Sequence, residues 1–446
     1  MEVRLPRARC VRCGHRPVKR AVVVGSGISG LAAAWKLTRQ GWQVTVLERD
    51  QWIGGRVRRV AYEGMDIDVG AAFVTDFYFH ARKIMREIGL ENELVRFSLD
   101  SAVEHDGKLK SLWPLPEMVA EGLLPVTALV RLAAGTMTLA PKWLSLNPGD
   151  LDAGIAYDDE TAQSWSERVY GAEVTERVIK PLLRGVVHWD AETTSRAVLF
   201  AMLKAFLAHP RAYVPRTGMA ALPLAMADGL TVQTGARVTG IVRSGTGWAV
   251  HCDRDGGPET FEADAVVCSA PATQVADLVP ELSHVDKEFF AGVRYSSTAV
   301  AVVKVDGKPD TLRKSVWFTM QDQSSIVGMT PYLFRDDDRD YSIVRISLSD
   351  PAYRGNAGMS DGELGQFVID SARRMPQLST LLRSGSVVGL ARWPEALPVF
   401  DVGHLKKVRS WRSRNSGSLV FAGDYLRGPY LEGAVRSGLE AAARLG

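Results

Sequence analysis

Residues 21–30 read AVVVGSGISG, a run of small apolar residues that ends in three glycines with the spacing G-x-G-x-x-G. The apolar residues 21–24 are typical of a buried parallel strand, and the Ala- and Leu-rich stretch after the glycines predicts a helix. Gly25 permits the tight turn, Gly27 lets the backbone approach a pyrophosphate, and Gly30 allows the helix to pack closely on the strand. The free N–H groups at the start of that helix would hold the phosphates.

The segment QVTVLE, residues 43–48, predicts a second strand that ends at Glu48. A carboxylate at this position accepts hydrogen bonds from a ribose 2′-hydroxyl and repels a 2′-phosphate, so it disfavours NADP. Strand, helix and terminal acid together predict a cofactor that contains ADP, and they leave open which one.

A second pair of glycines follows in ERDQWIGGRV, residues 48–57. Gly54, Gly55 and Arg56 suit a close approach of the backbone and neutralisation of charge at the phosphates of a cofactor larger than NAD. The same glycines are also typical of a surface turn, because glycine pairs are frequent in loops.

The C-terminal stretch SLVFAGDYLRGPYLEGAVRSGLEAAARL, residues 418–445, decides between these alternatives. It predicts a strand at 419–422, a turn at Gly423 and Asp424, and a helix from about Gly433. With this stretch the chain resembles the flavin-containing amine oxidase superfamily, to which protoporphyrinogen oxidases, monoamine oxidases and plant-type carotene desaturases belong. The resemblance runs from about residue 18 to the C-terminus and includes GSGISGLAAAWKL, LERDQWIGGRV, DVGAAFV, GARVTGIV, ADAVVCSAPA and FAGD…EGAVRSG.

The resemblance implies FAD as the cofactor. In the family, the residue matching Asp424 contacts the ribityl–pyrophosphate region, the backbone near Ala434 and Val435 contacts the flavin pyrimidine, and the residue matching Val238 contacts adenine. We expect non-covalent binding, because covalent attachment in the amine oxidases uses a cysteine near the C-terminal motif and the last cysteine here is Cys268. The predicted cofactor contacts are Gly25, Gly27, Ile28, Ser29, Gly30, Glu48, Arg49, Gly54, Gly55, Arg56, Gly70, Ala71, Ala72, Phe73, Val238, Trp393, Gly423, Asp424, Glu432, Gly433, Ala434 and Val435.

The resemblance also implies an α/β fold, α+β overall, with a discontinuous Rossmann-type FAD-binding domain and an inserted substrate domain of mixed sheet and helices. The FAD-binding domain would take residues 18–75, 213–290 and 395–446. The substrate-binding domain would take residues 76–212 and 291–394, including an apolar helical segment at 111–145, after a basic tail at 1–17.

Four stretches are similar to the protoporphyrinogen oxidase branch, and the most specific is ARWPEALPVFDVGHLKKV, residues 391–408. Three features differ from one branch or another. The C-terminal GDYLRGPYLEGAVRSG is more similar to amine oxidases and carotene desaturases than to typical protoporphyrinogen oxidases. Ser101 stands where plant-type enzymes carry an arginine that binds a substrate propionate. A serine hydroxyl cannot form the bidentate hydrogen bonds that a guanidinium forms with a carboxylate. Lys304 comes too late in its strand to match the lysine of monoamine oxidases.

The implied chemistry is removal of a hydride from a C–C or C–N bond of a hydrophobic small molecule, with dioxygen or another acceptor reoxidising the flavin. An amine or amino-acid oxidase, a carotenoid-type desaturase and a non-catalytic flavoprotein remain alternatives. The candidate catalytic side chains are Arg184, His188, Trp393 and Tyr430. Packed or ion-paired roles remain open for Arg184 and His188, and a core role remains open for Trp393.

The composition fits a globular enzyme of more than one domain, with 446 residues, 46% hydrophobic and 24% charged. A net charge of +3 does not indicate nucleic-acid binding. Cys10 and Cys13 have the spacing of half a zinc ribbon, but no second pair follows, so we predict no metal site. We expect a cytoplasmic monomer or homodimer, and segment 111–145 leaves open peripheral contact with a membrane.

Overall fold

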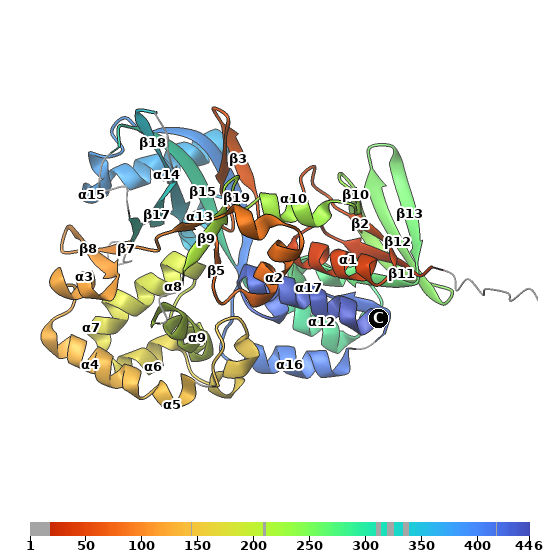
Figure 1. Cartoon of the computed structure of the whole chain (residues 1–446), viewed down its shortest axis with the longest axis horizontal. Coiled ribbons are helices and arrows are strands. Elements are labelled where there is room, and N and C mark those ends of the chain that lie inside the picture. Colours follow the sequence, from red (N-terminus) through yellow and green to blue (C-terminus); the bar gives the residue numbers. More distant parts are fainter. Residues whose placement is uncertain are drawn as a thin grey trace, which may run out of the picture.

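The computed structural model describes residues 18–143, 145–207, 211–308, 314–318, 325–332, 339–415 and 417–446. Figure 1 shows a nucleotide-binding part on the right, a second sheet at the upper left and a helical lobe at the lower left. The basic tail at 1–17, with Cys10 and Cys13, lies outside the described residues.

The nucleotide-binding part is built on a five-stranded sheet with the order β10-β2-β1-β14-β20, and every neighbouring pair is parallel. In this register Val22 lies between Thr45 and Val266. The central strand is buried on both faces, which explains its run of apolar residues. The strands are β1 (Arg20–Val24), β2 (Gln43–Leu47), β10 (Thr231–Gln233), β14 (Ala265–Cys268) and β20 (Leu419–Phe421).

Two helices from opposite ends of the chain, α1 (Ile28–Arg39) and α17 (Leu431–Leu445), pack together against one face of this sheet (Figure 1). Glycine permits their close approach, because a Cβ on Gly438 would lie 2.0 Å from the carbonyl oxygen of Ser29. The other face packs against an antiparallel sheet of β11 (Arg237–Ser244), β12 (Gly247–Arg254) and β13 (Gly257–Ala263). Around this part lie α2 (Phe79–Glu87), α10 (Ala221–Ala227), α11 (Ala272–Leu278), α12 (His284–Ala291), α16 (His404–Arg414) and the 3₁₀ turns Leu90–Glu93 and Asp424–Leu426.

The second sheet has the order β19-β15-β18-β17-β16-β7-β8, antiparallel except between β16 and β7. Its strands are β7 (Ser101–His105), β8 (Lys108–Trp113), β15 (Tyr295–Asp306), β16 (Ser315–Trp317), β17 (Ile326–Tyr332), β18 (Tyr341–Leu348) and β19 (Ser386–Pro398). One face packs on α14 (Asp361–Arg373), flanked by α13 (Asp350–Gly355) and α15 (Pro376–Ser379). The opposite face packs on a hairpin of β3 (Arg59–Tyr62) and β4 (Met65–Asp68).

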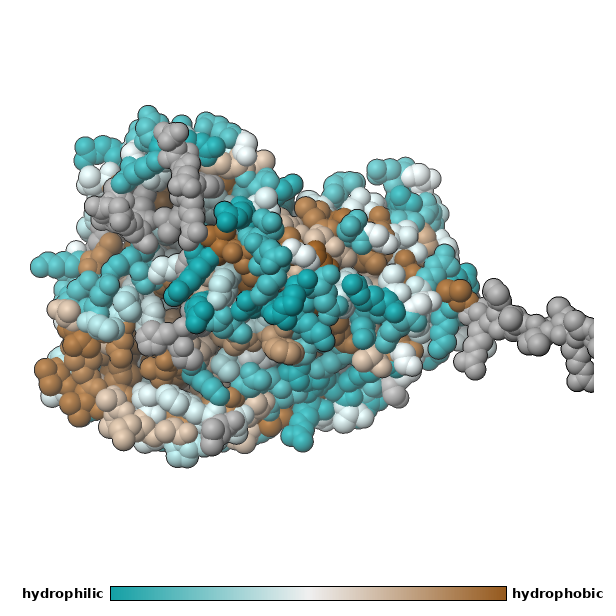
Figure 2. Space-filling model, viewed as in Figure 1, coloured by the Kyte–Doolittle hydropathy of each residue, from teal (hydrophilic) through white to brown (hydrophobic). Residues whose placement is uncertain are grey.

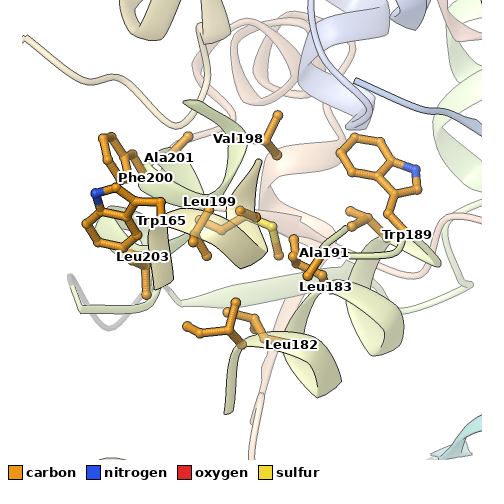
Figure 3. Close-up of a cluster of buried hydrophobic side chains, with 14 of the residues drawn as sticks. Trp165, Leu182, Leu183, Trp189, Ala191, Val198, Leu199, Phe200, Ala201 and Leu203 are labelled. Atoms are coloured by element: carbon orange, nitrogen blue, oxygen red, sulfur yellow. The ribbon is translucent and has the colours of Figure 1, made fainter. Parts of the chain in front are cut away.

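The helical lobe packs around one apolar core, part of which Figure 3 shows. Trp165 and Phe200 meet edge to face there, with ring centroids 4.7 Å apart. The lobe comprises α3 (Leu115–Ala120), α4 (Val126–Met137), α5 (Ala140–Trp143), the 3₁₀ helix Leu151–Tyr157, α6 (Ala162–Val169), α7 (Ala172–Val174), a π-helical turn (Thr175–Ile179), α8 (Lys180–Val187) and α9 (Arg196–Leu207). A small sheet of β5 (Val74–Thr75), β9 (Ala212–Pro215) and β6 (Leu94–Phe97) joins the lobe to the rest.

The predicted α/β class with a Rossmann-type sheet is confirmed. The parallel sheet takes strands from all three stretches that the sequence assigned to the FAD-binding domain, although the domain boundaries themselves stay a prediction.

The apolar segment 111–145 contains the end of β8 and the short helices α3 to α5. One face of α3 and α4 is exposed, and Figure 2 shows a hydrophobic patch at this corner, at the lower left. Its exposed side chains are Leu115, Val119, Val126, Val130 and Met137, which we call the α3–α4 apolar face. Among the described residues, no helix has both the length and the hydropathy of a transmembrane span.

Candidate functional site

A cavity of about 1290 Å³ extends from the carboxyl ends of β1 and β2 to the face of the seven-stranded sheet. We call it the central cavity. Ligands of open parallel sheets bind at this end of the strands. Of the predicted cofactor contacts, its lining contains Gly25, Gly27, Ile28, Ser29, Glu48, Arg49, Gly54, Gly55, Arg56, Gly70, Ala71, Ala72, Phe73, Val238, Trp393, Gly423, Asp424 and Ala434.

The first glycine turn has the geometry that a pyrophosphate needs. Gly25 has a φ of +95°, and a Cβ on Gly30 would lie 2.1 Å from the carbonyl oxygen of Gly25. A Cβ on Gly27 would meet nothing within 4 Å, so the backbone there is open to the cavity. The N-terminus of α1 has no side-chain cap, and its free N–H groups suit an anion.

Glu48 is buried at the end of β2, with 6% of its surface exposed. One carboxylate oxygen accepts hydrogen bonds from the backbone N–H of Ser26 at 2.8 Å and from its hydroxyl at 2.7 Å. The other accepts a bond from the backbone N–H of Asp50 at 3.0 Å. A carboxylate can accept about four hydrogen bonds, so Glu48 keeps acceptor capacity for a ribose hydroxyl.

The second glycine pair lies against the first glycine turn. A Cβ on Gly55 would lie 3.1 Å from the Cα of Gly27, and Gly54 forms a parallel bridge with Gly27. Arg56 donates hydrogen bonds to the carbonyl oxygen of Ala396 at 2.8 Å and to Asp424 at 2.9 Å. Burial is the largest influence and would lower the pKa of Arg56, but the charge and hydrogen bond of Asp424, with the charges of Tyr295 and Glu395, together hold this pKa above its usual value. The glycine pair Gly54–Gly55 therefore forms part of the cavity wall and is not a surface turn.

The C-terminal motif places the N-terminus of α17 at the cavity. A Cβ on Gly433 would lie 2.3 Å from the carbonyl oxygen of Gly428, so only glycine permits this turn. This helix also lacks a side-chain cap, and Leu431 and Ala434 of its first turn line the cavity. A helix N-terminus here would stabilise negative charge on a bound flavin.

Four predicted cofactor contacts lie behind the lining. Three of them do not line the cavity and are packed in the interior: Gly30, Gly433 and Val435. The carboxylate of Glu432 points to another helix, where it accepts hydrogen bonds from the backbone N–H groups of His80 and Ala81 and so caps α2.

Trp393 forms one wall of the cavity beside Gly70. Its indole N–H donates to the carbonyl oxygen of Val69 at 2.9 Å, and a Cβ on Gly70 would lie 3.4 Å from the indole ring. Tyr430 also lines the cavity, and burial raises the pKa of its hydroxyl. Both rings therefore line the space that a ligand would occupy.

His188 ends α8 in a left-handed conformation, with a φ of +55°, and lines the cavity. Its Nδ1 atom is buried without a hydrogen-bond partner in the described part of the chain. Burial lowers the pKa of His188 to about 4, and the nearby charge of Asp350 opposes this only in part, so the imidazole is neutral near pH 7. Arg184 does not line the cavity, since its guanidinium pairs with Asp190 at 3.0 Å.

Several lining residues were not identified from the sequence. The seven-stranded sheet contributes Trp317, Thr330, Tyr332, Arg345 and Ser347. The ring of Trp317 packs on α8, where a Cβ on Gly185 would lie 2.4 Å from it. One feature of the sequence could have identified Arg345, because it is a lone arginine in an otherwise uncharged strand, YSIVRISL.

Comparisons with known proteins agree with this geometry. A profile of the family described as "Flavin containing amine oxidoreductase" matches residues 28–446. The coproporphyrinogen III oxidase of Bacillus subtilis is 23% identical over 461 residues, which cover 93% of this chain and 94% of that protein.

Two solved structures share the fold. One, from an Exiguobacterium species and provisionally named a protoporphyrinogen oxidase, has a TM-score of 0.74 at 20% identity, covering 96% of this chain and 98% of that one. The other is the cyclohexylamine oxidase of Brevibacterium oxydans, with a TM-score of 0.71, 18% identity and the same coverage. The family profile spans nearly the whole chain, and both glycine turns and the C-terminal helix meet at one cavity. The chain belongs to the flavin-containing amine oxidoreductase family, and it is a flavin-dependent oxidoreductase.

Proposed function

We propose that the chain binds FAD non-covalently and dehydrogenates a hydrophobic porphyrinogen-type substrate, with dioxygen as electron acceptor. The observation that carries the proposal is the continuity of the central cavity, whose lining runs from Glu48 through Arg56 and Trp393 to Trp317 and His188. One end suits a dinucleotide and the other suits a large apolar molecule.

The residues present fit FAD along its whole length. Glu48 and Val238 lie where the adenosine would bind, and the open backbone of Gly27 leaves space for the pyrophosphate. Asp424 and the uncapped N-terminus of α17 would hold the ribityl chain and the flavin. Cys268, the last cysteine, is buried in β14 and does not line the cavity, which supports non-covalent binding.

When bound, the flavin would accept a hydride from the substrate. Trp393 and Tyr430 would orient the substrate, and the apolar lining would exclude water. Neutral His188 could take up the substrate proton at Nδ1, its unpartnered nitrogen. Arg184 would act as a positioning residue, because its ion pair with Asp190 spans the turn that holds His188.

The choice of a porphyrinogen rests on the relatives named above, of which the B. subtilis coproporphyrinogen III oxidase matches nearly the full length. Among the described residues, no lysine lines the cavity, so the side chain that would favour the amine oxidase alternative is not found there. Lys304 lies over the ring of Tyr341, 4.4 Å from its centroid, and does not line the cavity.

Anaerobic addition of coproporphyrinogen III or protoporphyrinogen IX tests the proposal. We expect either compound to bleach the visible absorbance of the bound flavin, and air to restore it with formation of a fluorescent porphyrin. Cyclohexylamine, putrescine, NADH and NADPH serve as controls and should leave the flavin oxidised. Bleaching by an amine, with none by either porphyrinogen, would refute the substrate assignment.

We also propose that the α3–α4 apolar face contacts a membrane surface. Val126 and Met137 are each 75% exposed and Val130 is 63% exposed, on one side of α4. A short helix with one exposed apolar face is typical of binding at a bilayer interface.

A further inference from the structure

Arg345 is a charged side chain at the substrate end of the central cavity. It lies on β18, paired with Val302 of β15 on one side and with Thr330 of β17 on the other. Thr330, Tyr332 and Ser347 line the cavity around it, and its guanidinium carbon lies 5.8 Å from the centroid of the Tyr332 ring. The partial exposure of Arg345 is thus to the cavity.

Most of the hydrogen-bonding capacity of Arg345 is unused. One terminal nitrogen, Nη1, donates to the backbone carbonyl oxygen of Asp68 at 2.9 Å. The Nε atom is buried without a partner, and Nη2 donates to no group in the described part of the chain. A buried donor without an acceptor is costly, so an acceptor from a ligand would be favourable here.

The two unused nitrogens form one edge of the guanidinium. The N–H groups of Nε and Nη2 are parallel, and this edge matches the two oxygens of a carboxylate. The free donors therefore have the geometry of a bidentate carboxylate site.

The charge of Arg345 is not neutralised by an ion pair. No carboxylate of the described residues lies within 4.0 Å of its nitrogens. The acid whose charge acts on the pKa of Arg345 is Asp68, and the two side-chain oxygens of Asp68 accept the N–H of Met219 at 3.0 and 2.9 Å. Arg56 and Arg392 also line the cavity, but they pair with Asp424 and Asp361.

We propose that the Nε–Nη2 edge of Arg345 binds a carboxylate of the substrate. The substrate class is then an apolar molecule with an anionic substituent, which Arg345 would orient in the central cavity that Trp393 and Tyr430 also line. This inference rests on the proposed function only in placing the substrate in the central cavity. Arg345 on β18 would then bind the carboxylate that the serine at position 101, which replaces the arginine of the plant-type enzymes, cannot bind as an ion pair.

Binding of a fluorescent probe tests this assignment without turnover. Pyrenebutyrate and pyrenebutanol share one apolar body and differ in the carboxylate, and a flavin quenches pyrene emission on binding. We expect the FAD-loaded full chain to bind pyrenebutyrate about 10- to 100-fold more tightly than pyrenebutanol, the range for hydrogen bonds to a charged group. Arg345→Met should abolish this preference and leave the affinity for pyrenebutanol unchanged.

Two further variants keep the test decisive. Arg345→Lys retains the charge but lacks the fork, so it should lose most of the preference even if Arg345→Met does not fold. Arg216→Met removes an exposed arginine from the lining and should keep the preference. Equal binding of acid and alcohol by the wild type, or an equal loss in Arg216→Met, would overturn the proposal.

The result is separable from the proposed function. A retained preference for the acid without oxidation of porphyrinogens would refute the substrate assignment alone. Oxidation of porphyrinogens with no preference for the acid would refute the role of Arg345 alone.

Discussion

Arg56 and Asp424 lie 368 positions apart in the chain, and a hydrogen bond of 2.9 Å between Nη2 of Arg56 and the Asp424 carboxylate joins them at the wall of the central cavity. The pair connects the second glycine turn to the C-terminal motif. Both segments contain predicted cofactor contacts, and their ion pair joins the two halves of the cofactor site.

Removing one partner of this pair should destabilise the fold. In Asp424→Ala, Arg56 would keep only the carbonyl oxygen of Ala396, and we expect the free energy of unfolding to fall by about 1–3 kcal/mol. This range is below that of a fully buried pair, because the Arg56 side chain is 35% exposed. Urea denaturation of the apoprotein measures the change.

Arg168→Met provides the control, because it removes an exposed ion pair with Glu160 and should cost less than about 1 kcal/mol. Equal losses in the two variants would contradict a structural role for the Arg56–Asp424 pair.

Glu48→Gln should weaken FAD binding, and it should also lower the stability of the fold, because its amide nitrogen cannot accept one of the backbone N–H bonds that the carboxylate oxygens accept. The amide keeps the size of the side chain but loses the charge that strengthens a hydrogen bond to a ribose hydroxyl. We expect a loss of about 2 kcal/mol of cofactor affinity, measured as the Kd of the apoprotein for FAD. Ser26→Ala is the matched control, because it removes the hydroxyl that bonds Glu48 without touching the carboxylate. Unchanged affinity in Glu48→Gln would show that the ribose binds elsewhere.

The bound cofactor should leave the protein on acid precipitation. We expect a yellow supernatant that contains FAD by chromatography, since no cysteine follows Cys268 to form a covalent link near the C-terminal motif. A yellow pellet, or FMN in the supernatant, would refute non-covalent FAD.

His188 should make folding stability depend on pH in acid. Its pKa is lowered from 6.5 to about 4 by burial, so between these values the unfolded chain binds a proton that the folded chain does not. Stability should therefore fall as the pH decreases from 6.5 towards 4, by up to about 3 kcal/mol. Asp68 acts oppositely, because burial raises its pKa to about 6.

The difference between wild type and His188→Gln isolates the histidine, because Asp68 contributes equally to both. In urea titrations the variant should lose less stability than the wild type between pH 6.5 and pH 4. Parallel curves would mean that His188 is hydrated in the folded protein.

Sedimentation with anionic liposomes tests the α3–α4 apolar face. We expect the chain without residues 1–17 to pellet with the vesicles at moderate salt, because the exposed valines of α4 would insert into the interface. Val126→Ser combined with Val130→Ser should release it, while Val285→Ser, at an exposed valine of α12, should not. Failure of the tail-free chain to pellet would refute the membrane contact.

Much of the cofactor site could be predicted because its requirements are local. The spacing of Gly25, Gly27 and Gly30 predicted the turn between β1 and α1, and the structure has that turn. Glu48 was expected at the end of a strand and lies there, buried. The role of Glu432 could not be predicted from neighbouring residues, because its carboxylate caps α2, a helix about 350 positions earlier in the chain.

By itself, the sequence determined the parallel nucleotide-binding sheet and the class of cofactor, because glycine turns, a buried apolar strand and a terminal acid are recognised from neighbouring residues. Only the tertiary structure decided which side chains face the substrate. Arg345, His188 and Trp317 come from separate elements of the chain, and strand register and helix packing select the face that each presents to the cavity. No local pattern encodes that selection, so the free edge of Arg345 became visible only in the folded chain.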